Sequence, residues 1–316
     1  MFKKSLSIYL VAAVTSFALA PFDLASARTK QVVEGVLTQN LEAARSFQQG
    51  VNFYNQGDFQ QADRAFRQAL GQDSNIALAY HYLGIIQSKQ GNFPSAIAAY
   101  REAVRLNPAL AQAYYNLGVA LYQQGELQAA SAAFAQAIQI DPSNPDAFYN
   151  WGLTLYQQEQ FSQASTAYQQ AIRLAPNNAN AYYNLGLALE KEGQLKAATS
   201  AYQQAVNIDP RFVAARNSLG NVLARQNQLE AAIIAYREAV NRQPNNASAN
   251  YNWGMALYNL GRIRDASARL RRARDLYRQQ NDLETADRID QFVREIEAKW
   301  RGISDFRFKI ADFIAK

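Results

Sequence analysis

The chain has 316 residues, with 32 Lys and Arg against 26 Asp and Glu, one His and no Cys. Without cysteine it forms neither disulfides nor thiolate metal sites. With one histidine and no glycine-rich phosphate loop, the common nucleophilic, metal and nucleotide mechanisms lack their residues. We therefore expect no enzyme activity, no cofactor and no bound metal.

Residues 1–27 have the parts of a secretory signal peptide. Two lysines precede an apolar stretch over 6–20, and small residues at 25 and 27 end the segment. An uncleaved membrane anchor is the alternative, but the stretch is shorter than the ~20 residues that a span requires. We expect cleavage after Ala27, export to the periplasm or another extracytoplasmic compartment, and a helical N-terminal extension over 28–42.

From residue 43 to residue 276, seven glycines recur at one phase with a spacing of 34 residues. They are Gly50, Gly84, Gly118, Gly152, Gly186, Gly220 and Gly254. Each unit also has two alanines at fixed phase with one bulky residue between them, which is Phe66, Tyr100, Phe134, Tyr168, Tyr202, Tyr236 or Leu270. Small residues at fixed phase indicate where helices cross closely, and the bulky residue fills the space that they leave.

Each unit predicts two helices joined by a turn, as residues 111–144 illustrate. The first half has apolar residues at helical spacing, and Gly125 then supplies the left-handed residue that ends a helix. The second half has one apolar stripe, and Pro142 cannot continue the helix. One such unit cannot bury both stripes alone, so neighbouring units must stack into a solenoid.

This period, with its small-aromatic-small spacing and closing proline, resembles the tetratricopeptide repeat family. The resemblance implies an all-α fold, a right-handed α-solenoid superhelix of seven helix-turn-helix repeats. The repeats are expected over 43–76, 77–110, 111–144, 145–178, 179–212, 213–246 and 247–276. The resemblance also implies that the first helix of each repeat lines a concave groove that binds protein or extended peptide.

A Tyr-Asn pair recurs on these first helices. The candidate groove residues are Tyr115, Asn116, Tyr149, Asn150, Tyr183, Asn184, Asn217, Asn221, Tyr251 and Asn252. An asparagine offers both a donor and an acceptor, so a row of them can bind the main chain of an extended peptide without reading its side chains. Alternatively, the amides cap or stiffen neighbouring helices.

Several positions depart from the repeat. Glu159 occupies a turn position that is elsewhere glycine, so we expect a turn there that is strained or differently shaped. Arg216 and Asn250 replace an aromatic residue, which predicts a more polar inner face in the last two repeats. The one histidine, His81, lies on a first helix, where we expect it to face the groove or solvent.

Seven arginines crowd the last repeat and the turn after it. They are Arg262, Arg264, Arg269, Arg271, Arg272, Arg274 and Arg278. Such a basic patch can hold an acidic protein or an anionic lipid surface. In the alternative, the arginines pair with acids of the following segment. Export and the lack of interleaved aromatic residues argue against nucleic acid as a partner.

Residues 277–300 predict a capping helix, because Asn281 and Glu284 have the spacing of a reciprocal cap and an apolar stripe follows. Residues 301–316 form an apolar and basic tail that packs back on the solenoid, docks into a partner or lies on a membrane surface. The function predicted is a non-catalytic scaffold that binds protein or peptide in the groove. The alternative is a structural assembly factor that docks on an envelope or membrane complex through the basic last repeat and the tail. The oligomeric state stays open.

Overall fold

The computed structural model describes residues 40–314, and of residues 302–314 it describes the backbone only. The predicted signal peptide and nearly all of the predicted extension over 28–42 lie outside the described residues. Within residues 40–314 the chain forms fifteen α-helices and no strand, so the predicted all-α solenoid of helical hairpins is confirmed. The helices are α3 (Leu41–Asn55), α4 (Phe59–Gln72), α5 (Ala77–Lys89), α6 (Phe93–Leu106), α7 (Ala111–Gln123), α8 (Leu127–Ile140), α9 (Pro145–Gln157), α10 (Phe161–Leu174), α11 (Ala179–Lys191), α12 (Leu195–Ile208), α13 (Val213–Arg225), α14 (Leu229–Arg242), α15 (Ala247–Asn259), α16 (Ile263–Gln279) and α17 (Leu283–Ile314).

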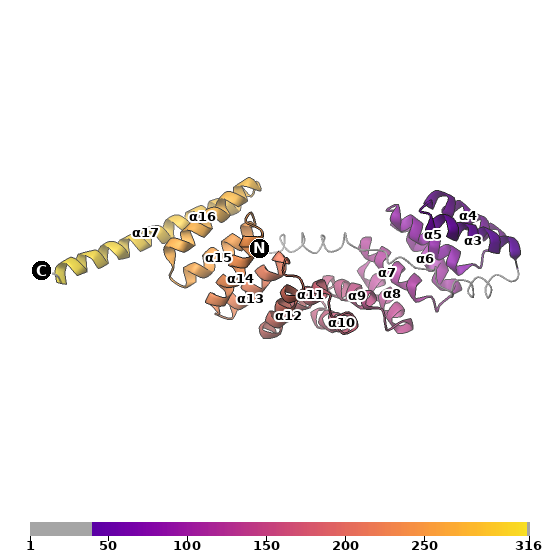
Figure 1. Cartoon of the computed structure of the whole chain (residues 1–316), viewed down its shortest axis with the longest axis horizontal. Helices are drawn as coiled ribbons and strands as arrows, with labels where there is room; N and C mark the ends of the chain where they lie inside the picture. Colours follow the sequence, from indigo (N-terminus) through magenta and orange to yellow (C-terminus); the bar gives the residue numbers. More distant parts are fainter. Residues whose placement is uncertain (1–39, 315–316) are drawn as a thin grey trace. The chain divides into compact units, whose positions relative to one another are not determined.

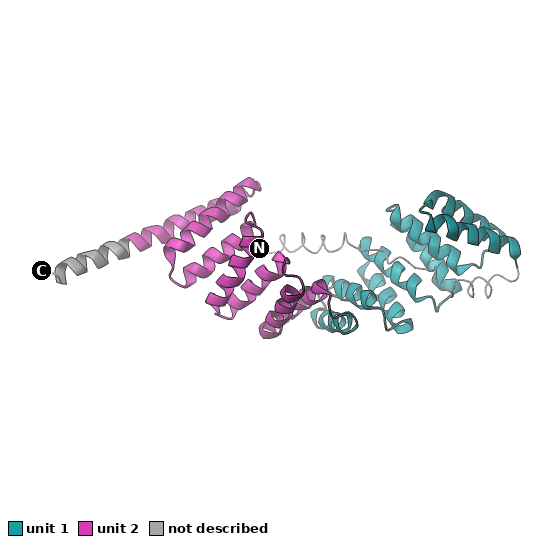
Figure 2. Ribbon diagram, in the orientation of Figure 1, with its two compact units in different colours: residues 1–176 teal, residues 177–316 magenta. Residues whose placement is uncertain are grey.

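The chain divides into two compact units, residues 1–176 and residues 177–316 (Figure 2). The described part of unit 1 is the hairpins from α3/α4 to α9/α10, and that of unit 2 runs from α11/α12 to α15/α16 and ends with α17 (Figure 1). Within each unit, the second helix of a hairpin packs against the first helix of the next, as α6 does on α7 and α14 on α15. A continuous row of first helices therefore lies beside a row of second helices in each unit.

The two helices of a hairpin cross at the recurring glycine. A Cβ built on Gly118 would stand 2.8 Å from the ring of Phe134, and one on Gly186 would stand 2.5 Å from the ring of Tyr202. Both rings are fully buried. No side chain fits at such a position unless the ring moves, so the glycine frame marks steric contacts, as the sequence predicted.

The turn inside each hairpin needs one left-handed residue. Five of these turns use glycine, for example Gly125 with φ 78°. Glu159 adopts φ 61° and Asn227 adopts φ 60°. The turn at Glu159 thus has the same left-handed form as the others, so it is not differently shaped. Because glutamate has a Cβ, this conformation is strained, which was the other expectation.

Helix α17 begins differently from the prediction. Asn281 is not the cap, because it takes the left-handed conformation of the preceding turn, with φ 61°. Asp282 caps the helix instead, and its Oδ1 accepts a hydrogen bond of 3.1 Å from the backbone N–H of Thr285. The sequence signal was one residue out of place because asparagine suits both the cap and the left-handed turn.

The predicted boundary between a capping helix and a tail at residue 300 is absent. The backbone of α17 stays helical for 32 residues, to Ile314. The apolar residues beyond 300 include Ile303, Phe306, Ile310 and Phe313, and their spacing of three and four residues continues a helix. None of the described helices is both long and apolar enough to span a membrane.

Candidate functional site

The amides of the predicted ladder are buried in three of the repeats. Asn116, Asn150 and Asn184 are 3%, 4% and 4% exposed. The Nδ2 of Asn116 lies 2.9 Å from Nε2 of His81, and Asn150 donates a hydrogen bond of 2.9 Å to the hydroxyl of Tyr115. In both pairs the partner lies 35 residues earlier, on the first helix of the preceding repeat.

The expectation that these three amides face an open groove is therefore wrong. For Asn116 and Asn150 the alternative applies, because each amide links its helix to the first helix before it. Both amides are buried where their helix contacts the first helix of the preceding repeat. The Nδ2 hydrogen bonds of these two amides stabilise the stack, since an unpaired buried donor at such a junction would be costly.

The tyrosines of the ladder contact other aromatic rings. Tyr115 is buried, whereas Tyr149 and Tyr183 are half-buried. Ring centroids lie 5.9 Å apart for Tyr149 and Tyr168, and 4.9 Å apart for Tyr183 and Phe212. These ring contacts stabilise the fold, and direct contact of the tyrosines with a peptide stays a prediction.

His81 is 1% exposed, so the expectation that it faces the groove or solvent is wrong. Burial lowers its pKa to about 4. At neutral pH the ring is therefore uncharged, and Nε2 can accept the hydrogen bond from Asn116. The histidine replaces a tyrosine of the later repeats in a structural link, not in a catalytic site.

Arg216 and Asn250 do not make a polar inner face, which corrects that expectation. Arg216 is 9% exposed, donates a hydrogen bond of 2.9 Å to the carbonyl of Pro210 and pairs with Glu238. Asn250 is fully buried and donates to the carbonyl of Asn246 at 2.9 Å. Both side chains donate to carbonyl groups just before their own helix, at a position where four of the other repeats have an aromatic residue and the first has Ser46.

Three amides of unit 2 are gathered into one cluster on the first-helix side. Asn217 and Asn221 lie one turn apart on α13, Asn252 lies on α15, and all three are half-buried. The Nδ2 of Asn252 donates to Oδ1 of Asn221 at 2.9 Å and to Oδ1 of Asn217 at 3.3 Å. The hydroxyl of Tyr236, on α14, donates to the same oxygen of Asn221 at 2.8 Å. We call Asn217, Asn221 and Asn252 the amide cluster.

Some hydrogen-bonding capacity of the amide cluster is unused. Among the described residues, no hydrogen bond reaches the N–H2 groups of Asn217 and Asn221 or the Oδ1 of Asn252. None of these atoms is fully buried. The cluster can therefore donate to, and accept from, a group that arrives from solvent.

The charges beside the amide cluster compensate each other. Arg225, one turn beyond Asn221 on α13, contacts Glu190 of α11 at 2.7 Å. The other oxygen of Glu190 accepts a hydrogen bond of 3.0 Å from the hydroxyl of Tyr202. Sequence reasoning missed this pair, although its separation of 35 residues is the one that also joins the amides.

The seven arginines of the predicted basic patch all have partners. Three pair with acids of α17: Arg271 with Glu297 at 2.7 Å, Arg274 with Asp290 at 2.7 Å and Arg278 with Asp287 at 3.5 Å. The other four contact Asp265, Trp300, Trp253 and Asn245 (Arg262, Arg264, Arg269 and Arg272, respectively). The alternative interpretation, in which arginines pair with the following segment, is confirmed for the first three. The patch is largely a seam between α16 and α17.

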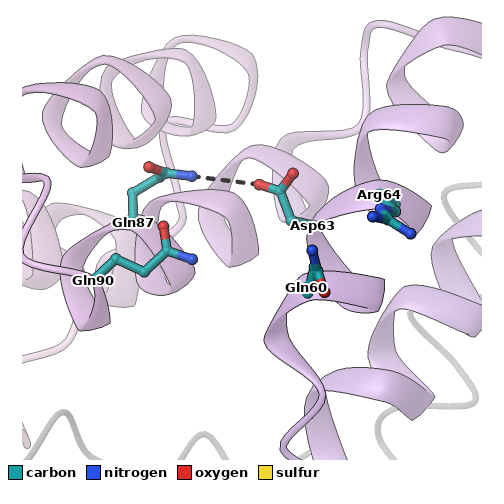
Figure 3. Close-up of a pocket in the computed structure, with 5 residues that line it drawn as sticks. All are labelled: Gln60, Asp63, Arg64, Gln87 and Gln90. Atoms are coloured by element: carbon teal, nitrogen blue, oxygen red, sulfur yellow. Dashed lines mark hydrogen bonds between the residues drawn. The ribbon is translucent and has the colours of Figure 1, made fainter.

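A shallow polar pocket of about 250 Å³ lies in unit 1 between α4 and the end of α5. Figure 3 shows Gln87 and Gln90 on one side, with Gln60 and Asp63 facing them and Arg64 beyond. Gln87 donates to Asp63 at 3.4 Å. Among the described residues, no group of three or more His, Asp or Glu could hold a metal ion.

Comparisons with known proteins agree with this architecture. The family described as the cilia and flagella-associated protein 70 C-terminal domain, a tetratricopeptide repeat family, matches residues 12–255. Among curated proteins none matches. The crystal structure of YrrB, a tetratricopeptide repeat protein with an unusual peptide-binding site, is 28% identical with a TM-score of 0.56, over 60% of this chain and 97% of that one.

Two further solved structures are similar. A crystal structure of MamA is 29% identical with a TM-score of 0.51, over 54% of this chain and 93% of that one. A tetratricopeptide repeat protein from Parabacteroides merdae is 13% identical with a TM-score of 0.53, over 79% of this chain and 99% of that one. The latter likeness concerns the fold alone.

Proposed function

Because the chain belongs to the family of the cilia and flagella-associated protein 70 C-terminal domain, whose tetratricopeptide repeats are protein-interaction scaffolds, we propose that it binds an extended peptide segment of a partner at the amide cluster of unit 2. The scaffold does no chemistry itself. It holds the partner on the side of α13 and α15 that carries Asn217, Asn221 and Asn252.

The unused polar atoms of the amide cluster carry this proposal. Among the described residues, two N–H2 groups and one carbonyl oxygen of the cluster have no partner. A peptide group offers the complementary carbonyl and N–H. The side chains are held by hydrogen bonds on two helices, so little freedom is lost when a ligand binds. YrrB, similar to this chain, is described as having a peptide-binding site, which supports the same class of ligand.

The surroundings favour a neutral segment over a terminal carboxylate. Arg225 is the cation on α13 next to the amide cluster, and Glu190 neutralises it at 2.7 Å. A carboxylate would therefore lose water without gaining an uncompensated positive charge. Main-chain groups in the middle of an extended segment have no such cost.

The test uses the full chain and a peptide selected against it from a random displayed library. Replacing Asn221 and Asn252 together by alanine should weaken binding of that peptide at least tenfold, since each lost hydrogen bond is worth about 1 kcal/mol. The matched control is Asn241→Ala, an exposed amide on α14, which should leave the affinity unchanged. Equal affinities of all three proteins would refute the proposal.

The assembly-factor alternative keeps part of the basic patch and the C-terminal part of α17. Three of the seven arginines pair with acids of α17, which lowers the net positive charge that the patch offers to an acidic surface. One observation supports docking through the tail. Helix α17 has 32 residues, whereas α16, the helix on which it packs, has 17. If the peptide binds at the amide cluster, a chain that ends at Arg301 should keep its affinity for the peptide. If that shortened chain loses affinity while the variant with Asn221 and Asn252 replaced does not, the alternative is favoured.

We also propose that the protein acts outside the cytoplasm, on the signal-peptide pattern of residues 1–27. N-terminal sequencing of the exported chain should begin at Arg28. A chain that is retained inside the cell and begins at its initiator methionine would contradict export.

A further inference from the structure

Tyr236 lies beneath the amide cluster, and its hydroxyl has one described partner. The side chain is 2% exposed, and the hydroxyl contacts Oδ1 of Asn221 at 2.8 Å. Burial raises the pKa of Tyr236 well above the usual range, so the hydroxyl keeps its proton at any physiological pH. A buried O–H group with a proton needs an acceptor, and Asn221 supplies it.

This contact selects one of the two orientations of the Asn221 amide. If the amide turned over, its N–H2 group would face the tyrosine, and the phenolic O–H would lose its acceptor. The same turn would place two N–H2 groups together, because Nδ2 of Asn252 lies 2.9 Å from the present oxygen. Leaving such a buried donor unpaired disfavours the turned orientation roughly tenfold or more.

The orientation passes from Asn221 to the rest of the cluster. With its oxygen directed at Tyr236, Asn221 requires a donor from Asn252, and the second N–H of Asn252 then reaches Oδ1 of Asn217 at 3.3 Å. All three amides are thereby fixed by one hydroxyl. Three groups then have no hydrogen-bond partner in the part of the chain that the structure describes: the N–H2 of Asn217, the N–H2 of Asn221 and the Oδ1 of Asn252.

We propose that Tyr236 is a positioning residue that decides which atoms of the amide cluster donate and which accept. In this arrangement the cluster binds a main-chain peptide group by donating to the carbonyl oxygen of the peptide. This inference rests on the proposed function and adds to it the chemical group that is recognised. The ligand's carbonyl accepts from Asn217 or Asn221, and its N–H donates to Asn252.

The hydroxyl is separable from the packing role of the ring. The ring fills the space beside Gly220, where a Cβ would stand 2.5 Å from it. The same repeat position is phenylalanine at Phe66 and Phe134, and both are fully buried against their glycines. Tyr236→Phe should therefore fold and change only the hydrogen bond.

The experiment follows the side-chain N–H signals of asparagine by NMR in the full chain labelled with 15N-asparagine. The probes are N-methylacetamide, which has the carbonyl and N–H of a peptide group, and N,N-dimethylacetamide, which has the carbonyl only. Both should shift the signals of Asn217 and Asn221, and N-methylacetamide should bind more tightly. In Tyr236→Phe the Asn221 signals should move before any probe is added, and affinity for both probes should fall at least threefold.

Two further variants sharpen the test. Asn221→Asp keeps an acceptor for Tyr236 and Asn252 but removes the N–H2 group. Affinity for N,N-dimethylacetamide, which binds through its carbonyl only, should therefore fall more than affinity for N-methylacetamide. Tyr100→Phe, which removes the buried hydroxyl that contacts Ser88 at 3.3 Å in unit 1, should leave the cluster signals unchanged. If Tyr236→Phe behaves like this control while the wild type binds N-methylacetamide, the inference is overturned and the proposed function stands.

The other outcomes are also decisive. If neither probe shifts the Asn217 and Asn221 signals in the wild type, the proposed function fails together with the inference. If acetamide, which mimics an Asn or Gln side chain, binds more tightly than N-methylacetamide, the main-chain assignment is overturned.

Discussion

Replacing His81 by tyrosine should remove a large part of the acid sensitivity of unit 1. His81 is buried and its pKa is lowered from 6.5 to about 4. Tyrosine is the residue at the equivalent position of the next repeat, where Tyr115 receives the same hydrogen bond of 2.9 Å from Asn150. His81→Tyr therefore keeps the link to Asn116 and removes the titrating ring.

The magnitude follows from proton linkage. Between pH 6.5 and pH 4 the unfolded chain binds a proton at His81 and the native chain does not, so the free energy of unfolding decreases as the pH falls. The contribution is fully present above pH 6.5 and is lost as the pH drops to about 4. At about 1.36 kcal/mol for each pKa unit, the fall from 6.5 to about 4 corresponds to about 3 kcal/mol.

The assay is urea unfolding of the full chain at a series of pH values from 7.5 to 4, followed by circular dichroism. Amide hydrogen exchange of α5 and α7 locates the change in the first repeats. The free energy of unfolding should fall about 3 kcal/mol further in the wild type than in His81→Tyr. Because all other titratable groups are shared, parallel pH profiles would refute the burial argument.

Three further predictions concern stability. Gly118→Ala should lower the free energy of unfolding by about 1–3 kcal/mol, because its Cβ would meet the Phe134 ring at 2.8 Å; calorimetry measures the loss. Glu159→Gly should raise it by about 0.5–1 kcal/mol by relieving φ 61°, seen as a higher Tm. Asp290→Ala should cost about 1 kcal/mol, because it removes the ion pairs of Asp290 with Arg274, at 2.7 Å, and with Arg294. The loss should be smaller in 1 M NaCl, which denaturant titrations at both salt levels check.

Each of these stability predictions has a contradicting outcome. A wild-type Tm for Gly118→Ala would mean that the ring yields freely. A lower Tm for Glu159→Gly would mean that the glutamate side chain stabilises the turn more than its φ costs. An identical loss for Asp290→Ala at both salt concentrations would mean that packing, not charge, is the main contribution.

The repeat pattern predicted the hairpins well because it is set by steric contacts within one unit. Gly118 and Phe134 belong to the same hairpin, so their phase in the sequence fixes their meeting. At Glu159 the pattern predicted either a strained turn or a differently shaped one, and the structure has the strained left-handed form. These features depend on neighbours that the sequence itself places close together.

The binding face was less predictable because it depends on how one helix is turned toward the next. Asn150 and Asn252 hold the same repeat position, yet the first is buried and the second half-buried. Asn150 donates to the hydroxyl of Tyr115, whereas Asn252 donates to the amides of Asn217 and Asn221. Tyr115 and Val119 hold the positions of these two amides three repeats earlier. Such a difference follows from pairs of residues in adjacent repeats, which a single-repeat pattern does not register.

The two kinds of contact that organise the molecule differ in the sequence separation of the residues that they join. Gly118 meets Phe134 inside one hairpin, whereas Asn150 reaches back 35 residues to Tyr115 in the hairpin before. One extra residue in a loop between hairpins leaves the first contact intact and shifts the second out of register by a residue. Duplication or loss of a whole 34-residue module preserves both. Such a chain can therefore change its length in evolution by entire modules far more readily than by small insertions.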